Sequence, residues 1–204
     1  NKPYNIDDIE KDLPIVLKTP EGQGGTGVKV AVNRDDINDM IDNWCSDRNV
    51  TRFLTWPTHK NQGSTEKVLN LWLDEYRRIN IYNWCIELKE NGQAIGNISV
   101  VSIDENVESV EIGYCIGKEY WNKGIVTEAF LGIIKFLFEK VDVKRIFARH
   151  DTSNPASGAV MKKCGLKFEG INRKAGKNNS GICDMAVYSI LKEEYLKSEV
   201  GDKI

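Results

Sequence analysis

The chain has 204 residues, of which 41% are hydrophobic and 28% are charged, and its formal net charge is -2. This balance excludes an intrinsically disordered chain. It also argues against a nucleic-acid partner, because proteins built to hold nucleic acid usually carry a basic excess. No apolar run approaches the ~20 residues that span a bilayer, and the first residues lack the apolar region of a signal peptide, so no membrane contact is expected.

Cysteine usage predicts a reducing compartment. The five cysteines are odd in number, widely spaced and contain no C-x-x-C pair, which argues against a disulfide framework and against a zinc site. The two histidines, His59 and His150, are far apart in the sequence, so a histidine-based metal site is not expected either. We therefore expect buried free thiols, no metal and a cytoplasmic location.

The N-terminal part is polar and then rich in glycine. Residues 1–12 are expected to form an arm in front of a single domain over 13–204. Segments 15–17 and 28–32 flank a glycine-rich turn and predict a hairpin. Residues 22–27 match G-x-G-x-x-G, but they precede a strand instead of opening a helix, so we interpret them as a hairpin tip and not as a dinucleotide site.

Two helices are predicted next. Apolar residues at i, i+3, i+4 and i+7 from Ile37 to Trp44 indicate the first, with acidic residues in its first turn. A loop carrying Trp56 follows. Ser64 is a candidate cap for the second helix, whose apolar face extends to Ile79.

Strands and helices then alternate. Strands are predicted over 84–88, 94–101 and 107–116, with Asn91 and Gly92 as the turn between the first two. The later elements are expected to be a helix at 125–140, a strand at 145–149, a helix from Pro155 capped by Asn154 and ended by Gly165, a strand at 166–170, a polar loop at 174–181, a strand at 182–190 and a short helix at 192–198. This order predicts one α/β (α+β) domain, a mixed sheet with helices on both faces.

The segment from Glu111 to Ala129 is the most informative. It reads as a strand, a turn containing Gly124 and the first turn of a helix. Such a junction presents free backbone N–H groups at the positive end of the helix dipole, which suits a phosphate or pyrophosphate. With one glycine the motif is weak by itself, and an ordinary strand-to-helix connection is the alternative.

Five segments together carry a family resemblance. They are Phe-Leu-Thr-Trp-Pro at 53–57, Glu-Ile-Gly-Tyr at 111–114, Trp-Asn-Lys-Gly-Ile-Val-Thr-Glu-Ala at 121–129, Asn-Pro-Ala-Ser at 154–157 and Val-Tyr-Ser-Ile-Leu at 187–191. In this order, the sequence resembles the GNAT superfamily of acetyl-CoA-dependent N-acetyltransferases, in its RimJ/RimL-type branch, over roughly residues 28 to 195. The resemblance implies a single GNAT-like domain with about seven mostly antiparallel strands, splayed central strands and acetyl-CoA as co-substrate.

The resemblance also implies where acetyl-CoA binds. The pantetheine arm would pair with the end of the strand, and the pyrophosphate would bind at the turn that opens the helix. The residues implied are Cys115, Ile116, Gly117, Trp121, Asn122, Lys123, Gly124, Ile125, Val126, Thr127, Asn154 and Ser157. Two of them depart from the family pattern: Trp121 stands where Gln or Arg is common, and Val126 where Gly or Ala is common.

Candidate catalytic residues each have a structural alternative. Glu111 is the candidate base that takes the proton of the amine. The alternative is that it is a solvated or salt-bridged carboxylate of the strand. Ser157 is the candidate acid that protonates the CoA thiolate. The alternative is that its hydroxyl only makes a hydrogen bond at the start of the helix. A family tyrosine that often protonates the thiolate would fall at Met161, which has no proton to donate. Tyr114 and Trp56 are candidates for the acceptor pocket, or packing residues.

The acceptor implied is a primary amine, on a protein N-terminus or on a small molecule. An α-amine has a pKa near ~7.7–8.0 and needs only a modest base. The acidic residues Asp104, Glu105 and Glu108 near the strand entrance could attract a cationic amine. Because relatives often pair as dimers, the resemblance also makes a homodimer a possible assembly. A non-catalytic acyl-CoA-binding sensor is the alternative function.

Overall fold

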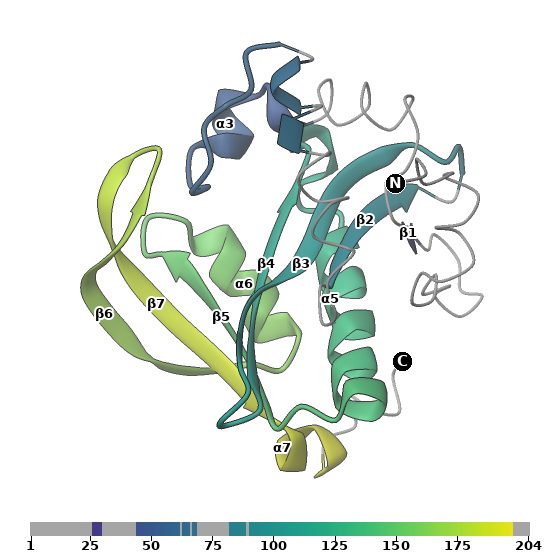
Figure 1. Cartoon of the computed structure of the whole chain (residues 1–204), viewed down its shortest axis with the longest axis vertical. Helices are drawn as coiled ribbons and strands as arrows, with labels where there is room; N and C mark the ends of the chain where they lie inside the picture. The colour runs from purple at the N-terminus through teal and green to yellow at the C-terminus, as the bar shows by residue number, and fades with distance from the viewer. Residues whose placement is uncertain are drawn as a thin grey trace, which may run out of the picture.

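The computed structural model describes residues 26–29, 44–61, 63–65, 67–68, 82–88 and 90–197. Within these residues, seven strands form one sheet in the order β1-β2-β3-β4-β5-β7-β6 (Figure 1). Their bounds are β1 Thr26–Lys29, β2 Asn83–Leu88, β3 Ala94–Asp104, β4 Ser109–Ile116, β5 Arg145–Asp151, β6 Lys167–Asn178 and β7 Gly181–Leu191. Among the described strands, β4 and β5 pair in parallel, and all other neighbours are antiparallel. The predicted mixed, mostly antiparallel sheet is confirmed.

The described helices are α3 (Arg48–Thr51), α5 (Ile125–Phe136), α6 (Pro155–Lys163) and α7 (Lys192–Lys197). A π-helical turn, Leu137–Val141, extends α5. Pro155 opens α6 at its first position, where a missing N–H costs nothing. Gly165, at φ 85°, follows its end in the left-handed conformation that glycine adopts freely. None of the described helices is long and apolar enough to span a bilayer.

Alternate residues of β4 divide between two hydrophobic clusters. Val110, Ile112 and Ile116 pack in a large cluster with the apolar side of α5, which includes Phe130. Cys115 instead packs in a smaller cluster with Trp44, Cys45, Val50, Cys85 and Ala94. Since successive side chains of a strand point to opposite faces, α5 covers one face of the sheet and the segment around α3 covers the other. The structure thus confirms that helices lie on both faces of the sheet.

The sheet opens between β4 and β5. These strands pair only at Ser109–Arg145, Val110–Ile146 and Glu111–Phe147. Beyond Glu111, β4 stays paired to β3 as far as Ile116, and β5 stays paired to β7 as far as Asp151. The two strands therefore diverge and form a fork whose closed end is at Glu111. The splayed central strands that the resemblance implied are confirmed.

One predicted loop is wrong. Residues 174–181 do not form a polar loop, because β6 continues to Asn178 and pairs with β7 in a long hairpin. Almost every residue of β6 is exposed or only partly buried, so the strand lacks the alternation of apolar and polar residues that normally identifies one.

Several predictions lie outside the described residues: the arm at 1–12, the segment 15–17, the first predicted helix up to residue 43 and most of the second. The predicted strand at 28–32 is described only at its start. There β1 pairs with β2.

Candidate active site

The turn before α5 has the shape of an anion site. Gly124 is the residue that precedes the helix and has φ 81°, and Asn122 has φ 60°. The first hydrogen bond of the helix runs from Glu128 N–H to Gly124 C=O, so the preceding N–H groups have no partner within the helix. Residues 121–124 are exposed. Main-chain donors in such a turn, at the positive end of a helix, suit a phosphate.

Trp121 has a role that the sequence did not reveal. Its indole Nε1–H donates to the Ile116 carbonyl at 3.0 Å. This bond ties the exposed turn to the end of β4, five residues earlier. Trp121 thus fixes the turn in place, whereas the Gln or Arg common at this position would offer a polar side chain to the phosphate.

The pairing of β4 with β3 decides which main-chain groups face the fork. Gly117 N–H donates to Ile95 C=O at 2.8 Å, and Gly96 lies opposite Ile116. Since backbone groups of alternate residues point to opposite edges of a strand, Cys115 and Gly117 face β3. Tyr114 and Ile116 direct their N–H and C=O groups to the open fork. Of the three predicted pantetheine contacts, Ile116 is the one that presents its main chain there.

Tyr114 and Ser157 meet across the fork. The Tyr114 hydroxyl lies 3.0 Å from the Ser157 carbonyl and 3.0 Å from Ser157 Oγ. The phenol has one proton, so when it donates to the carbonyl the serine hydroxyl is the donor in the second bond. Burial raises the pKa of Tyr114, so the phenol is neutral and acts as a hydrogen-bonding group.

The start of α6 partly corrects the sequence interpretation. Asn154 precedes the helix as predicted, but its side chain makes no capping hydrogen bond. Its backbone instead links to Asp151 and Ser157 through main-chain hydrogen bonds. Met161 is 1% exposed and belongs to the core. Its thioether has no proton to donate, so it does not replace the tyrosine that is common at this position.

Glu111 is ion-paired at the closed end of the fork. Arg149 of β5 donates to both of its carboxylate oxygens, from Nε at 2.8 Å and from Nη2 at 2.9 Å. Ser102 Oγ donates to Glu111 Oε2 at 3.1 Å. Hydrogen bonding to Glu111 raises the pKa of Arg149. Both carboxylate oxygens are thus engaged, and a role as a base would require Glu111 to exchange one of these donors for the amine or for water.

Trp56 and Tyr114 are not brought together. Trp56 packs against the smaller cluster, which contains Cys115. Tyr114 packs against the larger one, with its ring 5.6 Å from that of Phe130. The two predicted acceptor residues therefore lie on opposite faces of the sheet, and Trp56 is the one that shares a face with Glu111.

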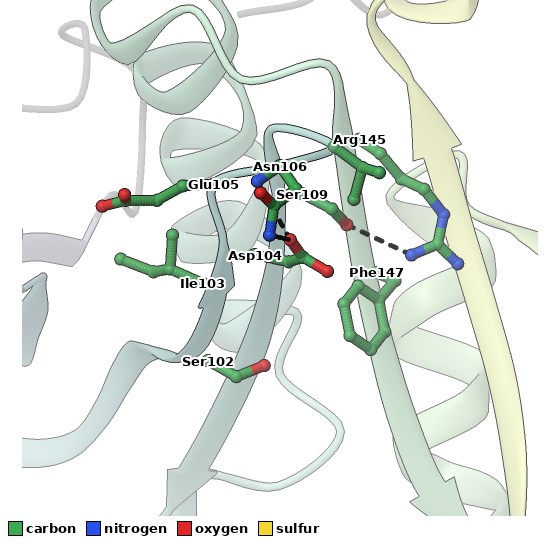
Figure 2. A pocket seen from close by; sticks show the side chains of 9 residues that line it. Ser102, Ile103, Asp104, Glu105, Asn106, Ser109, Arg145 and Phe147 are labelled. Atoms are coloured by element: carbon green, nitrogen blue, oxygen red, sulfur yellow. Dashed lines mark hydrogen bonds between the residues drawn. The ribbon is translucent and has the colours of Figure 1, made fainter.

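A cavity of about 740 Å³ opens beside the turn between β3 and β4 (Figure 2). Ser102, which bonds Glu111, is part of its wall, as are Asp104 and Glu105. Figure 2 shows Arg145 directed to Ser109, with a hydrogen bond of 3.3 Å, and Glu105 pointing away from Asp104. The predicted acidic turn therefore borders a hollow whose wall includes Ser102, the hydrogen-bond partner of Glu111.

The described residues contain no group of three His, Cys, Asp or Glu side chains that could hold a metal ion. None of the five cysteines, all of which lie in the described residues, forms a disulfide, and only Cys183 is not buried. Burial raises the pKa of Cys115 and of Cys164 to about 12, so both thiols are neutral. Cys115 donates to Asn97 Oδ1 at 2.8 Å.

Sequence reasoning missed the partners that other elements supply. Arg149 and Ser102 had no local signal, because their pairing with Glu111 depends on the register of three strands. The tip of the β6–β7 hairpin lies in the segment predicted as a polar loop, and no local signal indicated the contacts that it makes. Its contacts join residues that are more than 120 positions apart.

Comparisons with known proteins identify the family. Residues 30–167 match the family model described as an acetyltransferase (GNAT) domain. The uncharacterized N-acetyltransferase p20 of Bacillus licheniformis is 26% identical over 157 residues, which cover 77% of this chain and 88% of that protein. YdaF of Bacillus subtilis strain 168, named as a candidate ribosomal N-acetyltransferase, is 32% identical over 130 residues, 64% of this chain and 70% of YdaF.

Solved structures share the fold. Ribosomal-protein-S5-alanine acetyltransferase from Vibrio fischeri superposes with a TM-score of 0.75 at 18% identity, covering 89% of this chain and 99% of that one. RimL, a ribosomal L7/L12 α-N-protein acetyltransferase solved with coenzyme A, gives 0.73 at 18% identity, covering 84% and 96%. With the family model matching more than half of its length, the chain belongs to the GNAT acetyltransferase family.

Proposed function

We propose that the protein transfers an acetyl group from acetyl-CoA to a primary amine by direct attack of the amine on the thioester. The observation that carries this proposal is the fork between β4 and β5, which leads to the anion-binding turn at Gly124. The fork offers a slot for the pantetheine arm, and the turn offers main-chain donors for the pyrophosphate.

The cofactor would be held mainly by the main chain. Residues 122–127 would bind the pyrophosphate, and Trp121 would hold their turn against β4. The Ile116 N–H, directed into the fork, would pair with the pantetheine arm or polarise the thioester carbonyl. Asn154 lies near the same opening with its side chain unused by the helix, and would contact the pantetheine.

Proton transfer would involve Ser157 and Glu111. Ser157 Oγ would hydrogen-bond the departing sulfur, and Tyr114 holds the serine at the fork. Glu111 would accept the proton of the amine, directly or through water, after one of its present donors moves away.

The acceptor class is a protein N-terminus or a small amine. Among the structural neighbours are a candidate ribosomal-protein-serine acetyltransferase from Vibrio cholerae and a spermidine N-acetyltransferase chimera, both at 17% identity. We favour an α-amine as the acceptor. Its pKa near ~7.7–8.0 is lower than the ~10.4 of a lysine amine, so a weaker base can remove its proton. Trp56 would border the acceptor on the face it shares with Glu111.

One observation favours a second candidate function, a non-catalytic sensor of acyl-CoA. Both oxygens of Glu111 are engaged by Arg149, and the same arrangement would suit a purely structural ion pair. A sensor would bind the cofactor without turning it over.

The experiment compares wild type with Glu111→Gln and Ser157→Ala. Acetyl-CoA binding is measured by calorimetry, and turnover is measured on octapeptides that begin with Ser or Ala and on spermidine. We expect both variants to bind acetyl-CoA as wild type does, and we expect turnover to fall about 100-fold for a general acid–base residue. Cofactor binding without wild-type turnover on any of these amines would favour the sensor. No binding of acetyl-CoA would overturn both functions.

A further inference from the structure

Three consecutive residues at the tip of the β6–β7 hairpin, Asn178, Asn179 and Ser180, connect parts of the chain that the sheet alone would not join. The tip lies near α3 and the open end of the fork (Figure 1). It also lies beyond residue 167, where the match to the family model ends. The tip therefore lies outside the family match, while the residues that it contacts lie within it.

Asn179 makes the central contacts. Its side-chain amide donates to the Thr51 carbonyl and to the Trp56 carbonyl, each at 2.8 Å, so both amide protons are used. Its main-chain N–H donates to the Leu54 carbonyl at 3.2 Å. One residue thus holds three carbonyl groups of the segment 47–59.

Ser180 and Asn178 extend this junction on either side. Arg52 Nε donates to Ser180 Oγ, and Ser180 Oγ donates to the Arg52 carbonyl at 3.3 Å. Asn178 Nδ2 donates to Asp151 Oδ2 at 2.8 Å, at the last residue of β5. The hairpin tip therefore fastens the segment 47–59 to the end of one arm of the fork.

The fastened segment covers the acceptor side of the sheet. Leu54 and Trp56 pack against the cluster that contains Cys115, on the face where Glu111 lies. The segment is braced internally by a Thr51–Thr58 hydroxyl contact of 2.6 Å and by the bond from His59 N–H to Cys45 C=O. These bonds hold the segment together, and the hairpin tip connects it to the end of β5.

We propose that Asn179 is a specificity-determining positioning residue that sets where the segment 47–59, with Trp56, stands above the fork. This inference rests on the proposed function, because it assigns the segment to the wall of the acceptor site. Asn179 touches neither cofactor nor acceptor. It acts through the carbonyl groups of Thr51 and Trp56.

The test uses Asn179→Asp, which keeps the shape of the side chain but replaces the donating amide by an oxygen that repels both carbonyls. Asn172→Ala is the control, since Asn172 lies in β6, the strand that leads into the hairpin tip, and makes none of these contacts. Steady-state kinetics are run with the Ser- and Ala-initiated octapeptides and with spermidine. We expect the KM of the accepted amine to rise about tenfold, the factor that ~1.4 kcal/mol represents, with kcat and the Kd of acetyl-CoA unchanged.

A second measurement is independent of turnover. Hydrogen exchange of residues 47–59 should be about tenfold faster in Asn179→Asp than in wild type, because the loss of two hydrogen bonds favours local opening. Exchange in α5 should be unchanged. If Asn179→Asp fails to fold, the milder variant Ser180→Ala, which removes only the side-chain contacts with Arg52, replaces it with the same directions expected.

The outcomes separate this inference from the proposed function. Faster exchange with an unchanged acceptor KM would overturn the positioning role while leaving acetyl transfer intact. A change in kcat or in acetyl-CoA affinity equal to the change in acceptor KM would also overturn it, because it would indicate general loosening of the site. A wild type that binds acetyl-CoA but acetylates none of the three amines would count against the proposed function. Hydrogen exchange of residues 47–59 that is the same in Asn179→Asp and in wild type would show that Asn179 does not hold this segment.

Discussion

The two halves of the proposed site are built in different ways. On the cofactor side, the turn at Gly124 and the end of β4 offer main-chain groups set by a few neighbouring residues. On the acceptor side, the segment 47–59 is held by side chains from a distant hairpin. A site made from the main chain can keep one ligand while its side chains vary. A site made from side chains can change its ligand without disturbing the fold.

This contrast explains the two departures at the cofactor turn. Trp121 replaces a polar side chain, yet its indole secures the turn on which the main-chain donors stand. Val126 is buried in the large cluster, so its added bulk fills the core. In the proposed site, neither residue needs to contact the phosphate.

The largest expected effect is a loss of acetyl-CoA binding when the turn at Gly124 is distorted. Gly124→Val places a β-branched residue at φ 81°, a conformation that costs about 1–3 kcal/mol for such a side chain. Relief of this strain would move the main-chain donors, so we expect acetyl-CoA to bind about 10 to 100-fold more weakly. Calorimetry measures the change. Gly132→Val is the matched control, because Gly132 lies inside α5 with open space around it and no positive φ. Equal losses in the two variants would contradict the main-chain model.

The next effect acts where the halves meet, at the closed end of the fork. Arg149→Met leaves the Glu111 carboxylate, whose side chain is 12% exposed, without its ionic partner. Breaking a fully buried pair costs about 3–5 kcal/mol, and since the Arg149 side chain is 37% exposed we expect about 1–3 kcal/mol of lost stability. Urea unfolding measures it. In the double variant with Glu111→Gln the loss should be smaller than the sum of the single losses. Additive losses would mean that the two groups do not interact.

The smallest expected effect is a pH dependence of the free energy of unfolding, caused by His59 in the segment 47–59. Burial lowers the pKa of His59 from its ordinary value of 6.5. Well above pH 6.5 the imidazole is neutral in both the folded and the unfolded state. As the pH falls below 6.5, the unfolded chain binds the proton first, so the free energy of unfolding decreases until the lowered pKa of the folded state is passed.

Urea midpoints at pH 7.5 and pH 5.5 test this effect. Wild type should lose more stability between the two than His59→Gln, whose side chain does not titrate. Hydrogen exchange should locate the loss in the residues around His59 and its partner Thr65. An identical pH dependence in the two proteins would show that His59 contributes nothing to it.

Much of the fold could be predicted from the sequence because its signals are local. Pro155 and Gly165 mark the ends of α6, and Asn91-Gly92 marks the turn between β2 and β3. The prediction failed for β6, whose exposed residues carry no alternating pattern. For the same reason the hairpin tip, expected to be part of a loop, could not be recognised as a structural junction.

The sequence by itself determined the turn before α5, since a glycine, a helix start and a preceding strand end lie within about 15 residues of one another. Only the tertiary structure decided which side chains meet: Arg149 with Glu111, Ser157 with Tyr114, and Asn179 with the segment that carries Trp56. The physical reason is strand register. A shift of one residue turns every side chain to the other face, and the register is set by the packing of the whole sheet, which no short stretch of sequence contains.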